Sequence, residues 1–481
     1  MSAVPMEVVA RVESRSFTSD NTAGGAPEIV AAVAAAASGQ APPYGTDSWT
    51  LSARRRFSEI FDCDVDLLPV STGSAANALS LAALTPPWGS VLCHRDSHIN
   101  NDECGAPEFF TGGAKLIALG GENAKIDADE LQAAVHRKVG DVHSVQPSVL
   151  SLTQATETGA VYTPDEIGHL ADIAKHAGLR VHMDGARLAN AIAALGCNPA
   201  ELTWRAGVDM LSFGAIKNGS ITADAIVVFD RSLTTELSFR AKRAGQLAAK
   251  MRFAAAQLDA YLADDLWLRN AWHANAMTAR LEEGLKSIPG TRLAGTPEAN
   301  ILFCRLPQQV IDGLLDQGYD FYHGRWEPGV VRFVTSFATT AHDVDELVHA
   351  VRRLTAARSR KAGLNGFERR DQPAAADLRW RIWDASDDRD GHRGARLVGS
   401  VRPGADGEPG PAGRDAGAGA RGRARSARRR GLRRRAARLP GAQQRLRSAL
   451  PLRRTRRGRP PPLRRGPAPV GGVPRLPLGG L

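Results

Sequence analysis

The chain has 481 residues, which is enough for two or more domains and a large core. Its formal net charge of +11 is unevenly placed, because residues 361–481 carry 30 basic and 10 acidic side chains and residues 1–360 carry 32 basic and 41 acidic ones. The body is therefore acidic and gives no reason to expect nucleic-acid binding. All five cysteines lie in the body without a CxxC pair, which favours reduced thiols in the cytoplasm.

The beginning of the chain predicts no export. Residues 1–16 contain an acid, Glu7, and no apolar run of signal-peptide length. No segment approaches the ~18 consecutive apolar residues of a membrane-spanning helix. We expect a soluble cytoplasmic protein that does not enter a membrane.

Residues 26–357 alternate helix-like and strand-like segments, which is typical of an α/β protein. The segment 27–38 predicts a helix, with proline in its first turn and glycine after its end. Helical periodicity also marks 164–176 and 187–195. Short apolar runs predict buried parallel strands at 91–93, 115–119, 148–153, 180–183, 210–213 and 225–229.

The pattern changes after Arg231 and predicts a second, smaller domain. Long helices come first and are followed by two strands and a last helix: 232–263, 265–287, 300–305, 330–337 and 341–357. We therefore divide the chain into an N-terminal extension, a large domain, a small C-terminal domain and a tail: 1–15, 16–255, 256–358 and 359–481.

Residues 361–481 lose this pattern. They are rich in Arg, Gly, Pro and Ala, with runs such as 428–430 (RRR) and 460–462 (PPP), and they have little to bury. One interpretation is an arginine-rich tail for nucleic acid or a membrane surface. We favour the other, a disordered extension or a GC-rich sequence read out of frame, because arginine occurs there almost without lysine.

A lysine and an acid lie at the ends of two predicted strands: Lys217 in 212–219 (SFGAIKNG) and Asp184 in 182–187 (HMDGAR). A lysine that forms an imine with an aldehyde must be deprotonated despite an ordinary pKa of about 10.4, and a desolvated or cationic site achieves this. A carboxylate against a pyridine nitrogen keeps that nitrogen protonated. Each residue alone is more often structural, but the pair predicts a site for pyridoxal phosphate (PLP).

Three further features fit such a site. The segment 72–77 (TGSAAN) opens a helix whose N–H groups and hydroxyl suit a phosphate, although the same sequence is common as a simple cap. His98 follows a strand, where an imidazole stacks on a flat ring or satisfies a core polar group. Arg332 is a guanidinium in an apolar strand and needs a carboxylate partner, either a structural acid or a substrate.

The polar candidates gather at one edge of the predicted sheet. Ligands of open α/β sheets bind at the carboxyl ends of the strands, and His98, Gln154, Asp184 and Lys217 fall there. We predict an active site at this edge and no metal site.

Seven motifs, in this order and spacing, resemble those of the low-specificity L-threonine aldolases of the PLP fold-type I superfamily. They are 19–21 (SDN), 44–47 (YGTD), 73–77 (GSAAN), 102–110 (DECGAPEFF), 153–157 (TQATE), 182–187 (HMDGAR) and 212–219 (SFGAIKNG). The resemblance covers about residues 16–357. It implies fold type I, an α/β fold with a mostly parallel seven-stranded sheet between helices and a smaller α/β domain after it.

The resemblance also implies how the cofactor is held. Lys217 would be the Schiff-base lysine, Asp184 the partner of the pyridinium and His98 the residue that stacks on the ring. Two further residues, Lys242 and Arg252, would reach the phosphate from a neighbouring subunit. The full set of implied cofactor-binding residues is Gly73, Ser74, His98, Gln154, Asp184, Arg187, Lys217, Lys242 and Arg252.

The implied reaction is the cleavage of L-threonine or L-allo-threonine, a β-hydroxy amino acid, into glycine and acetaldehyde. Ser19, Arg187 and Arg332 would hold the substrate carboxylate. Our first candidate for the base that accepts the hydroxyl proton is His98, because imidazole accepts protons near neutral pH, and the second is Glu157. The family also implies a homotetramer with active sites between subunits.

The chain departs from the family pattern in two places. Ala215-Ile216 stands before the lysine where members commonly have Gly-Thr, so a hydroxyl near the phosphate is lost. Thr156-Glu157 stands where some branches carry a second histidine. Alternative functions are another fold-type I lyase or an aminotransferase, which would share Lys217, and nucleic-acid binding through the tail.

Overall fold

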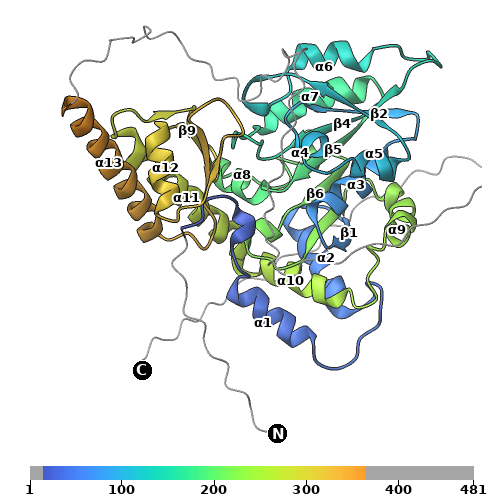
Figure 1. The fold of residues 1–481 in the computed structure, drawn as a ribbon. Coiled ribbons are helices and arrows are strands. Elements are labelled where there is room, and N and C mark those ends of the chain that lie inside the picture. The colour runs from blue at the N-terminus through green and yellow to red at the C-terminus, as the bar shows by residue number, and fades with distance from the viewer. Residues whose placement is uncertain (1–14, 365–481) are drawn as a thin grey trace, which may run out of the picture. The chain divides into compact units, whose positions relative to one another are not determined.

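The computed structural model describes residues 15–364, with side chains as far as residue 357. All of these residues belong to one unit of the chain, Met1–His392, and the other unit lies outside the described residues. The predicted extension before residue 15 and the predicted tail after residue 364 therefore stay predictions. Figure 1 shows a large sheet flanked by helices and a second group of strands with α11 to α13.

The large sheet has seven strands in the order β1-β7-β6-β5-β4-β2-β3. Five of them, β3, β2, β4, β5 and β6, run parallel to one another, which confirms the predicted mostly parallel sheet. In chain order the strands are β1 (Asp66–Val70), β2 (Gly89–His94), β3 (Lys115–Leu119), β4 (Gln146–Thr153), β5 (Arg180–Gly185), β6 (Met210–Phe213) and β7 (Asp224–Val228).

The predicted strand over 225–229 exists, but its predicted parallel direction is wrong. Strand β7 pairs antiparallel with both β1 and β6. The link from β6 to β7 is residues 214–223, and a crossover between parallel strands needs a dozen or more residues, usually with a helix. The link instead contains one 3-10 turn, η4 (Ile216–Asn218), and the chain reverses.

Strand β3 lies at the edge of the sheet, so the prediction of a buried strand over 115–119 is wrong for most of its length. Lys115 and Ala118 are exposed, and Leu119 is the buried residue of the strand. An edge strand has a neighbour on one side only, and its apolar run therefore does not imply full burial.

The predicted helix over 232–263 is two helices, α9 (Thr234–Arg243) and α10 (Arg252–Leu262). Gly245 follows α9 with a φ of 73°, in the left-handed region that glycine adopts without steric cost. Apolar residues continue at helical spacing through the break, for example Ala244, Leu247 and Met251. This continuity is the reason that periodicity predicts a single helix.

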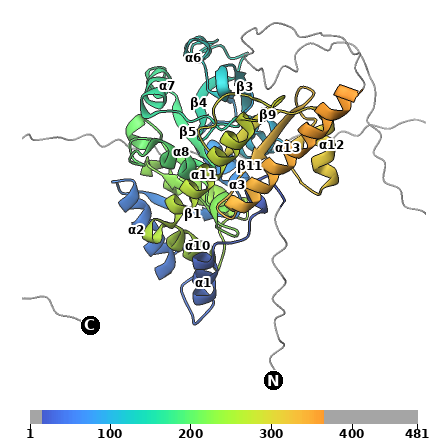
Figure 2. The same cartoon turned by 90° about the vertical axis from the view of Figure 1, so that its left-hand side faces the viewer.

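Helices cover both faces of the large sheet and give three layers (Figures 1 and 2). One apolar cluster joins the sheet to Phe57, Ile167 and Leu188, and the other joins it to Leu79 and Leu237. The remaining helices of this region are α1 (Pro27–Ala36), α2 (Ser48–Ile60), α3 (Gly73–Leu84), α4 (His98–Asn101), α5 (Ala106–Thr111), α6 (Ala128–Val135), α7 (Pro164–His176) and α8 (Leu188–Leu195). Short 3-10 turns are η1 (Asp20–Thr22), η2 (Glu122–Ala124), η3 (Trp204–Ala206), η5 (Arg231–Leu233) and η6 (Ala263–Asp265).

The second sheet is antiparallel, with four strands in the order β10-β11-β9-β8. It has its own apolar core, which includes Leu281, Leu347 and, from the N-terminal segment, Phe17. The predicted boundary near residue 255 stays a prediction. The elements are α11 (Leu266–Lys286), β8 (Arg292–Leu293), β9 (Ile301–Arg305), α12 (Gln308–Asp316), β10 (Tyr322–His323), β11 (Val330–Val334) and α13 (Ala341–Leu364). None of the described helices combines the length and the apolar composition that crossing a bilayer requires.

Candidate active site

A cavity of about 540 Å³ opens at the carboxyl ends of the parallel strands, at the predicted edge. Its lining comes from the segments after β2, β4, β5 and β6, from the start of α3, from the N-terminal segment and from the second sheet with the loop between β10 and β11. The residues discussed below that line it are Ser19, Gly73, Ser74, Asn77, His98, Asp102, Glu103, Glu157, Asp184, Arg187, Ile216, Lys217, Asp224, Tyr322, Arg325 and Arg332.

Lys217 lies in the turn η4 between β6 and β7. The turn is anchored by Asn218, whose Nδ2 donates to the Tyr261 hydroxyl at 2.6 Å and to the Trp267 carbonyl at 2.8 Å. Burial lowers the pKa of the Lys217 amine, and the Arg187 cation lowers it further. The site thus favours the deprotonated amine that imine formation requires.

Asp184 lies near the end of β5, and neutral donors hold its carboxylate. Its Oδ1 accepts from the Ala186 N–H at 3.0 Å and its Oδ2 from Asn77 Nδ2 at 2.9 Å. The residue is buried and lines the cavity. None of the ion pairs between described residues involves Asp184, so its charge is available to a cationic group in the cavity.

His98 opens the short helix α4 and is joined to a buried acid. Its Nδ1 lies 2.8 Å from Glu103 Oε1, and Asn77 Nδ2 donates to the same oxygen at 2.8 Å. The bond to Glu103 raises the pKa of His98, although burial opposes this shift. His98, Glu103, Asn77 and Asp184 therefore form one continuous hydrogen-bonded chain.

Glu157 follows β4 and lies against the backbone of His98. Its Oε1 accepts from the His98 N–H at 2.8 Å, and its Oε2 is buried with no hydrogen-bond partner among residues 15–357. Burial raises the pKa of Glu157 to about 7. A carboxyl group that is half ionised at neutral pH is well suited to proton transfer.

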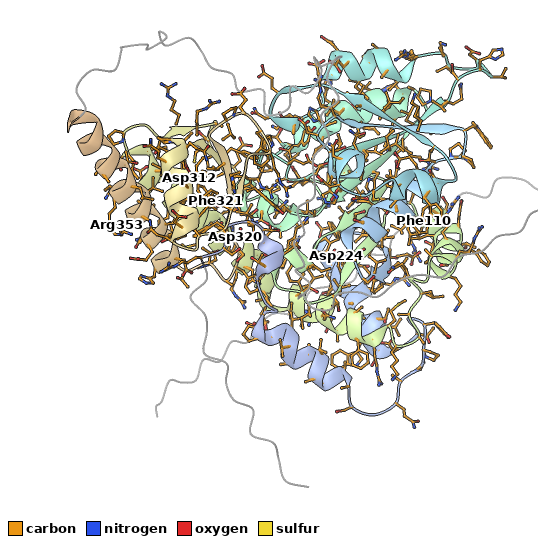
Figure 3. The ribbon with its side chains drawn as sticks, in the orientation of Figure 1. Phe110, Asp224, Asp312, Asp320, Phe321 and Arg353 are labelled. Carbon is orange, nitrogen blue, oxygen red and sulfur yellow. The ribbon has the colours of Figure 1, made fainter. Side chains whose placement is uncertain are left out.

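The two residues that depart from the family pattern before the lysine are fixed by a buried acid. The N–H groups of Ala215 and Ile216 donate to Asp224 Oδ1 at 2.7 and 3.0 Å. Asp224 begins β7 of the large sheet and is labelled in Figure 3. Burial raises its pKa. The turn before Lys217 is thus held by a carboxylate that the sequence analysis did not single out.

Arg187 lines the cavity but already has a carboxylate partner. Its Nε and Nη2 donate to the two carboxylate oxygens of Asp20 at 2.8 and 2.9 Å. Burial opposes ionisation of Asp20, but the Arg187 and Lys217 cations together with the hydrogen bonds from Arg187 and Asn300 outweigh burial and lower its pKa. Ser19 precedes Asp20 and also lines the cavity. A substrate carboxylate that Arg187 holds would therefore share this guanidinium with Asp20.

Arg332 on β11 lacks such a partner. Its Nη2 donates weakly to the Thr18 carbonyl at 3.3 Å, its Nε is buried without a hydrogen-bond partner, and no described carboxylate pairs with it. Burial lowers the pKa of Arg332 to about 10. Its guanidinium lies 4.5 Å from the centre of the Tyr322 ring, and Arg325 lies 3.9 Å from the same centre. Of the two partners that the sequence left open, the geometry favours a ligand carboxylate.

The start of α3 is the predicted binding site for the phosphate group of the cofactor. Thr72 caps this 12-residue helix, with its Oγ1 accepting from the Ala75 N–H at 3.1 Å. Gly73 and Ser74 are its first two residues and line the cavity. Free N–H groups and the positive end of the helix dipole suit an anion there.

Three predicted cofactor-binding residues do not line the cavity. The amide of Gln154 is hydrogen-bonded to the backbone of Tyr162: its Nε2 donates to the Tyr162 carbonyl at 2.8 Å, and its Oε1 accepts from the Tyr162 N–H at 3.0 Å. Gln154 therefore orders the loop after β4 and does not face the cavity. Lys242 lies over the Tyr44 ring at 5.0 Å, and Arg252 donates to the Gly39 carbonyl at 3.3 Å.

Six residues that line the cavity or hold its side chains in place have no predicted role from the sequence: Asp20, Asn77, Glu103, Asp224, Tyr322 and Arg325. Three of them stand inside motifs that carry the family resemblance, which was the available signal. The others, Asp224, Tyr322 and Arg325, stand outside these motifs, and no local pattern in the sequence marks them. Among the described residues, no three His, Cys, Asp or Glu side chains lie together so as to hold a metal ion.

Known proteins that are similar to this chain support the same kind of site. Residues 16–306 match the beta-eliminating lyase family. The chain is also 44% identical over 339 residues to a low specificity L-threonine aldolase of Pseudomonas aeruginosa, covering 70% of this chain and 97% of that one. The chain belongs to the beta-eliminating lyase family. The resemblance to low-specificity L-threonine aldolases that the motifs predicted is confirmed by this match.

Two further relatives also bear the name threonine aldolase. A low specificity L-threonine aldolase of Pseudomonas sp. (strain NCIMB 10558) is 41% identical over 345 residues, 72% of this chain and 99% of that one. A solved threonine aldolase structure from Leishmania major has a TM-score of 0.67 and 28% identity, and it covers 71% of this chain and 99% of that one. The predicted fold class is thereby confirmed.

Enzymes of this family depend on PLP, and the cavity fits that cofactor. Lys217 and Asp184 line one cavity with the start of α3, and the unpartnered Nε of Arg332 marks a place for a carboxylate. The residues that would hold PLP are thus Lys217, Asp184, His98, Gly73 and Ser74. The predicted PLP cofactor is confirmed, whereas the role of each residue stays a prediction.

Proposed function

We propose that this chain cleaves L-threonine and L-allo-threonine into glycine and acetaldehyde. The observation that carries the proposal is a single cavity that combines Lys217, Asp184 and Arg332, an arginine with no carboxylate partner among the described residues. Relatives at 44% and 41% identity bear the name of this activity, and they match over nearly their whole length. Substrate class and reaction follow from the site and from these relatives together.

Binding of the substrate starts from its carboxylate. Arg332 supplies a guanidinium whose Nε has no hydrogen-bond partner among the described residues, and Ser19 lies on the same cavity. Arg187 is held rigid by Asp20 and supplies its remaining donors. Charge-assisted bonds to arginine are the strongest that a carboxylate finds in a protein, so the substrate is oriented before its bonds change.

During the bond cleavage, a base of the protein accepts the proton of the substrate β-hydroxyl group. The Cα–Cβ bond breaks with its electron pair left on Cα, the β-hydroxyl proton goes to a base, the carbonyl product leaves as acetaldehyde, and Cα takes up a proton to give glycine. When bound, PLP would supply the electron sink for that pair, and Asp184 would hold the ring nitrogen in its protonated form.

Of our two candidates for the base, the structure favours Glu157 over His98. Glu157 has a buried, unpartnered Oε2 and a pKa raised by burial to about 7. The bond from Glu103 raises the pKa of His98 and so favours its charged form, which cannot accept a proton. We therefore assign the hydroxyl proton to Glu157 and give His98 the role of a cationic neighbour.

The test is an assay for acetaldehyde and glycine from L-threonine with the PLP-loaded protein. Lys217→Ala should lose the activity and the visible absorbance band of the bound cofactor while the fold remains. Lys115→Ala, an exposed lysine on β3, is the matched control and should keep both. A Lys217→Ala protein that still shows the band and the activity would refute the assignment.

The runner-up is β-elimination, since the matching family carries that name. It would release a 2-oxo acid and ammonia from threonine, so the same reaction mixture distinguishes the two. Nucleic-acid binding is not favoured by any of the relatives. Deletion of residues 365–481 should leave aldol cleavage intact, and an activity that needs the tail would contradict the proposal.

We also propose a cytoplasmic homotetramer with active sites between subunits. Lys242 and Arg252 lie outside the cavity of their own chain, as residues that serve a neighbouring site would. Phe109 and Phe239 are large apolar side chains that are more than 70% exposed, as expected of a surface that another subunit covers. Light scattering of the purified protein gives its mass, and a monomer that retains full activity would exclude shared sites.

A further inference from the structure

A buried carboxylate behind His98 is not needed to bind the substrate or the cofactor in the function proposed above. The Glu103 side chain is completely buried, whereas the His98 side chain is 39% exposed towards the cavity. Their contact is short, with 2.8 Å between Nδ1 and Oε1. The imidazole thus has one nitrogen against the protein interior and the other, Nε2, free to meet a ligand.

The local chain explains how Glu103 turns inward. The helix α4 ends after Asn101, and Cys104 and Gly105 follow with φ values of 52° and 74°. Two successive left-handed residues reverse the chain before α5 begins at Ala106. A left-handed conformation is costly for a residue other than glycine, so this turn is specified by its surroundings.

The amide of Asn77 extends the contact to the other side of the cavity. Its Nδ2 donates one hydrogen to Glu103 and the other to Asp184, at 2.8 and 2.9 Å. Asn77 Oδ1 and Glu103 Oε2 are buried and have no hydrogen-bond partner in the described chain. One neutral amide therefore separates two carboxylates and satisfies a single oxygen of each.

We propose that Glu103 is a positioning residue for His98: it keeps the proton on the Nδ1 side of the imidazole, presents Nε2 to the cavity and, through Asn77, ties the charge of His98 to that of Asp184. This inference deepens the proposed function, because it says why the imidazole beside the substrate stays charged while Glu157 accepts the proton. It concerns Glu103 and Asn77, which have no role in the proposed chemistry itself.

Electrostatics supports the geometry. The bond to Glu103 raises the pKa of His98, and burial raises the pKa of Glu103, so the pair retains a shared proton to higher pH than separate groups would. An ionised carboxylate accepts hydrogen bonds only, and the proton between the two therefore belongs on Nδ1. The charged groups that face His98 are Glu103, Glu157, Asp184 and Lys217, with Asp102 at the end of α4.

The test measures the protonation of His98 in the purified, PLP-loaded protein. Deuterium exchange at the imidazole Cε1–H, followed by mass spectrometry over a pH series, reports the pKa of individual histidines in an assembly of any size. In the unmodified chain the His98 midpoint should lie above the ordinary value of about 6.5. In Glu103→Gln it should fall by about one unit, because the side-chain shape remains and the charge is lost.

Two internal controls keep the measurement specific. His94, four residues away, has a pKa lowered by burial, and its midpoint should not change in Glu103→Gln. Glu282→Gln alters another buried acid, 8% exposed and paired with Lys286 in the small domain, and should leave His98 unchanged. Glu103→Asp restores the charge but shortens the reach, so it should recover part of the shift.

The link to Asp184 is tested separately by Asn77→Leu. The Glu103 contact to His98 remains in this variant, so the His98 midpoint should stay above 6.5 while the pH at which the cofactor absorbance changes should move. An unchanged absorbance titration would overturn the link through Asn77.

The proposal is overturned if His98 in the unmodified chain titrates at or below its ordinary value, a result that needs no variant to fold. It is also overturned if Glu103→Gln leaves the His98 midpoint unchanged. Absence of acetaldehyde from threonine would remove the proposed function but not this inference, because neither the exchange measurement nor the absorbance titration depends on turnover.

Discussion

The acids and the arginines of the cavity are held in opposite ways. Four acids, Glu103, Glu157, Asp184 and Asp224, accept hydrogen bonds from backbone N–H groups, from an asparagine amide or from an imidazole. None of the four forms an ion pair with a described lysine or arginine. Of the three arginines that line the cavity, Arg187 alone has a carboxylate partner among the described residues, whereas Arg325 and Arg332 lie over the ring of Tyr322.

The difference separates proton transfer from ligand binding. Burial raises the pKa of Glu103, Glu157 and Asp224, and it brings the pKa of Glu157 to about 7, where a carboxyl group exchanges protons at neutral pH. An arginine cannot exchange its proton and is useful as a fixed charge. Arg332 shows the second case, since its unpartnered Nε gains a bond when an anion binds.

Glu157→Gln would remove the proposed proton acceptor from the acids of the cavity and should reduce activity more than the other variants. We expect kcat to fall by about 10²–10⁴, the usual contribution of a general base. In the unmodified enzyme kcat/KM should increase as the pH rises through about 7, because the deprotonated carboxylate is the active form. The measurement is the rate of acetaldehyde release over a pH series.

A second glutamate serves as control for that experiment. Glu108 on α5 also has a buried, unpartnered Oε2, but it does not line the cavity. Glu108→Gln should therefore keep both the rate and its pH dependence. A Glu157→Gln enzyme whose pH profile equals that of the parent would assign the base to another group.

Arg332→Ala would remove the arginine that we propose to bind the substrate carboxylate. We expect the KM for threonine to rise by roughly 10- to 100-fold, as the loss of a charge-assisted hydrogen-bonded contact predicts. The visible absorbance of the cofactor should remain, because the arginine lies on the substrate side. Arg353→Ala, on the exposed surface of α13 and labelled in Figure 3, is the matched control. Loss of the cofactor in Arg332→Ala would show a structural role instead.

Asp224→Ala tests whether an acid of the cavity also supports the fold. Two N–H groups, of Ala215 and Ile216, would lose their acceptor, and we expect a cost of about 1–3 kcal/mol in the free energy of unfolding. Urea denaturation measures this cost. Asp312→Ala, whose acid on α12 bonds to Gln308 at the surface, should change stability by less than about 0.5 kcal/mol. Equal stability of both variants would mean that the turn is held by other contacts.

Arg325→Ala should have the smallest effect. Arg325 is exposed and stacks on Tyr322, so we expect less than about 1 kcal/mol, or a change in KM of up to fivefold. Comparison with Arg332→Ala under the same conditions shows whether burial or charge alone makes an arginine important in this cavity. If Arg325→Ala raised KM as much as Arg332→Ala, burial of an arginine would not determine its contribution to substrate binding.

Much of the site was predictable because its residues follow predicted strands. The carboxyl ends of β2, β4, β5 and β6 place His98, Asp184 and Lys217 at one edge, and parallel strands share that edge by construction. Gln154 follows the same rule in sequence but turns away towards Tyr162, a contact that strand order does not predict. A position at the edge predicts proximity, but not the direction of a side chain.

The sequence by itself determined the α/β order of elements, the family and the pair of residues that a PLP site needs, because these depend on local periodicity and on short motifs. The tertiary structure decided the protonation of the site. Several partners of these acids come from distant segments, for example Asn77 with Asp184 and His98 with Glu157. Burial and hydrogen bonds set a pKa, and neither exists until the chain is folded.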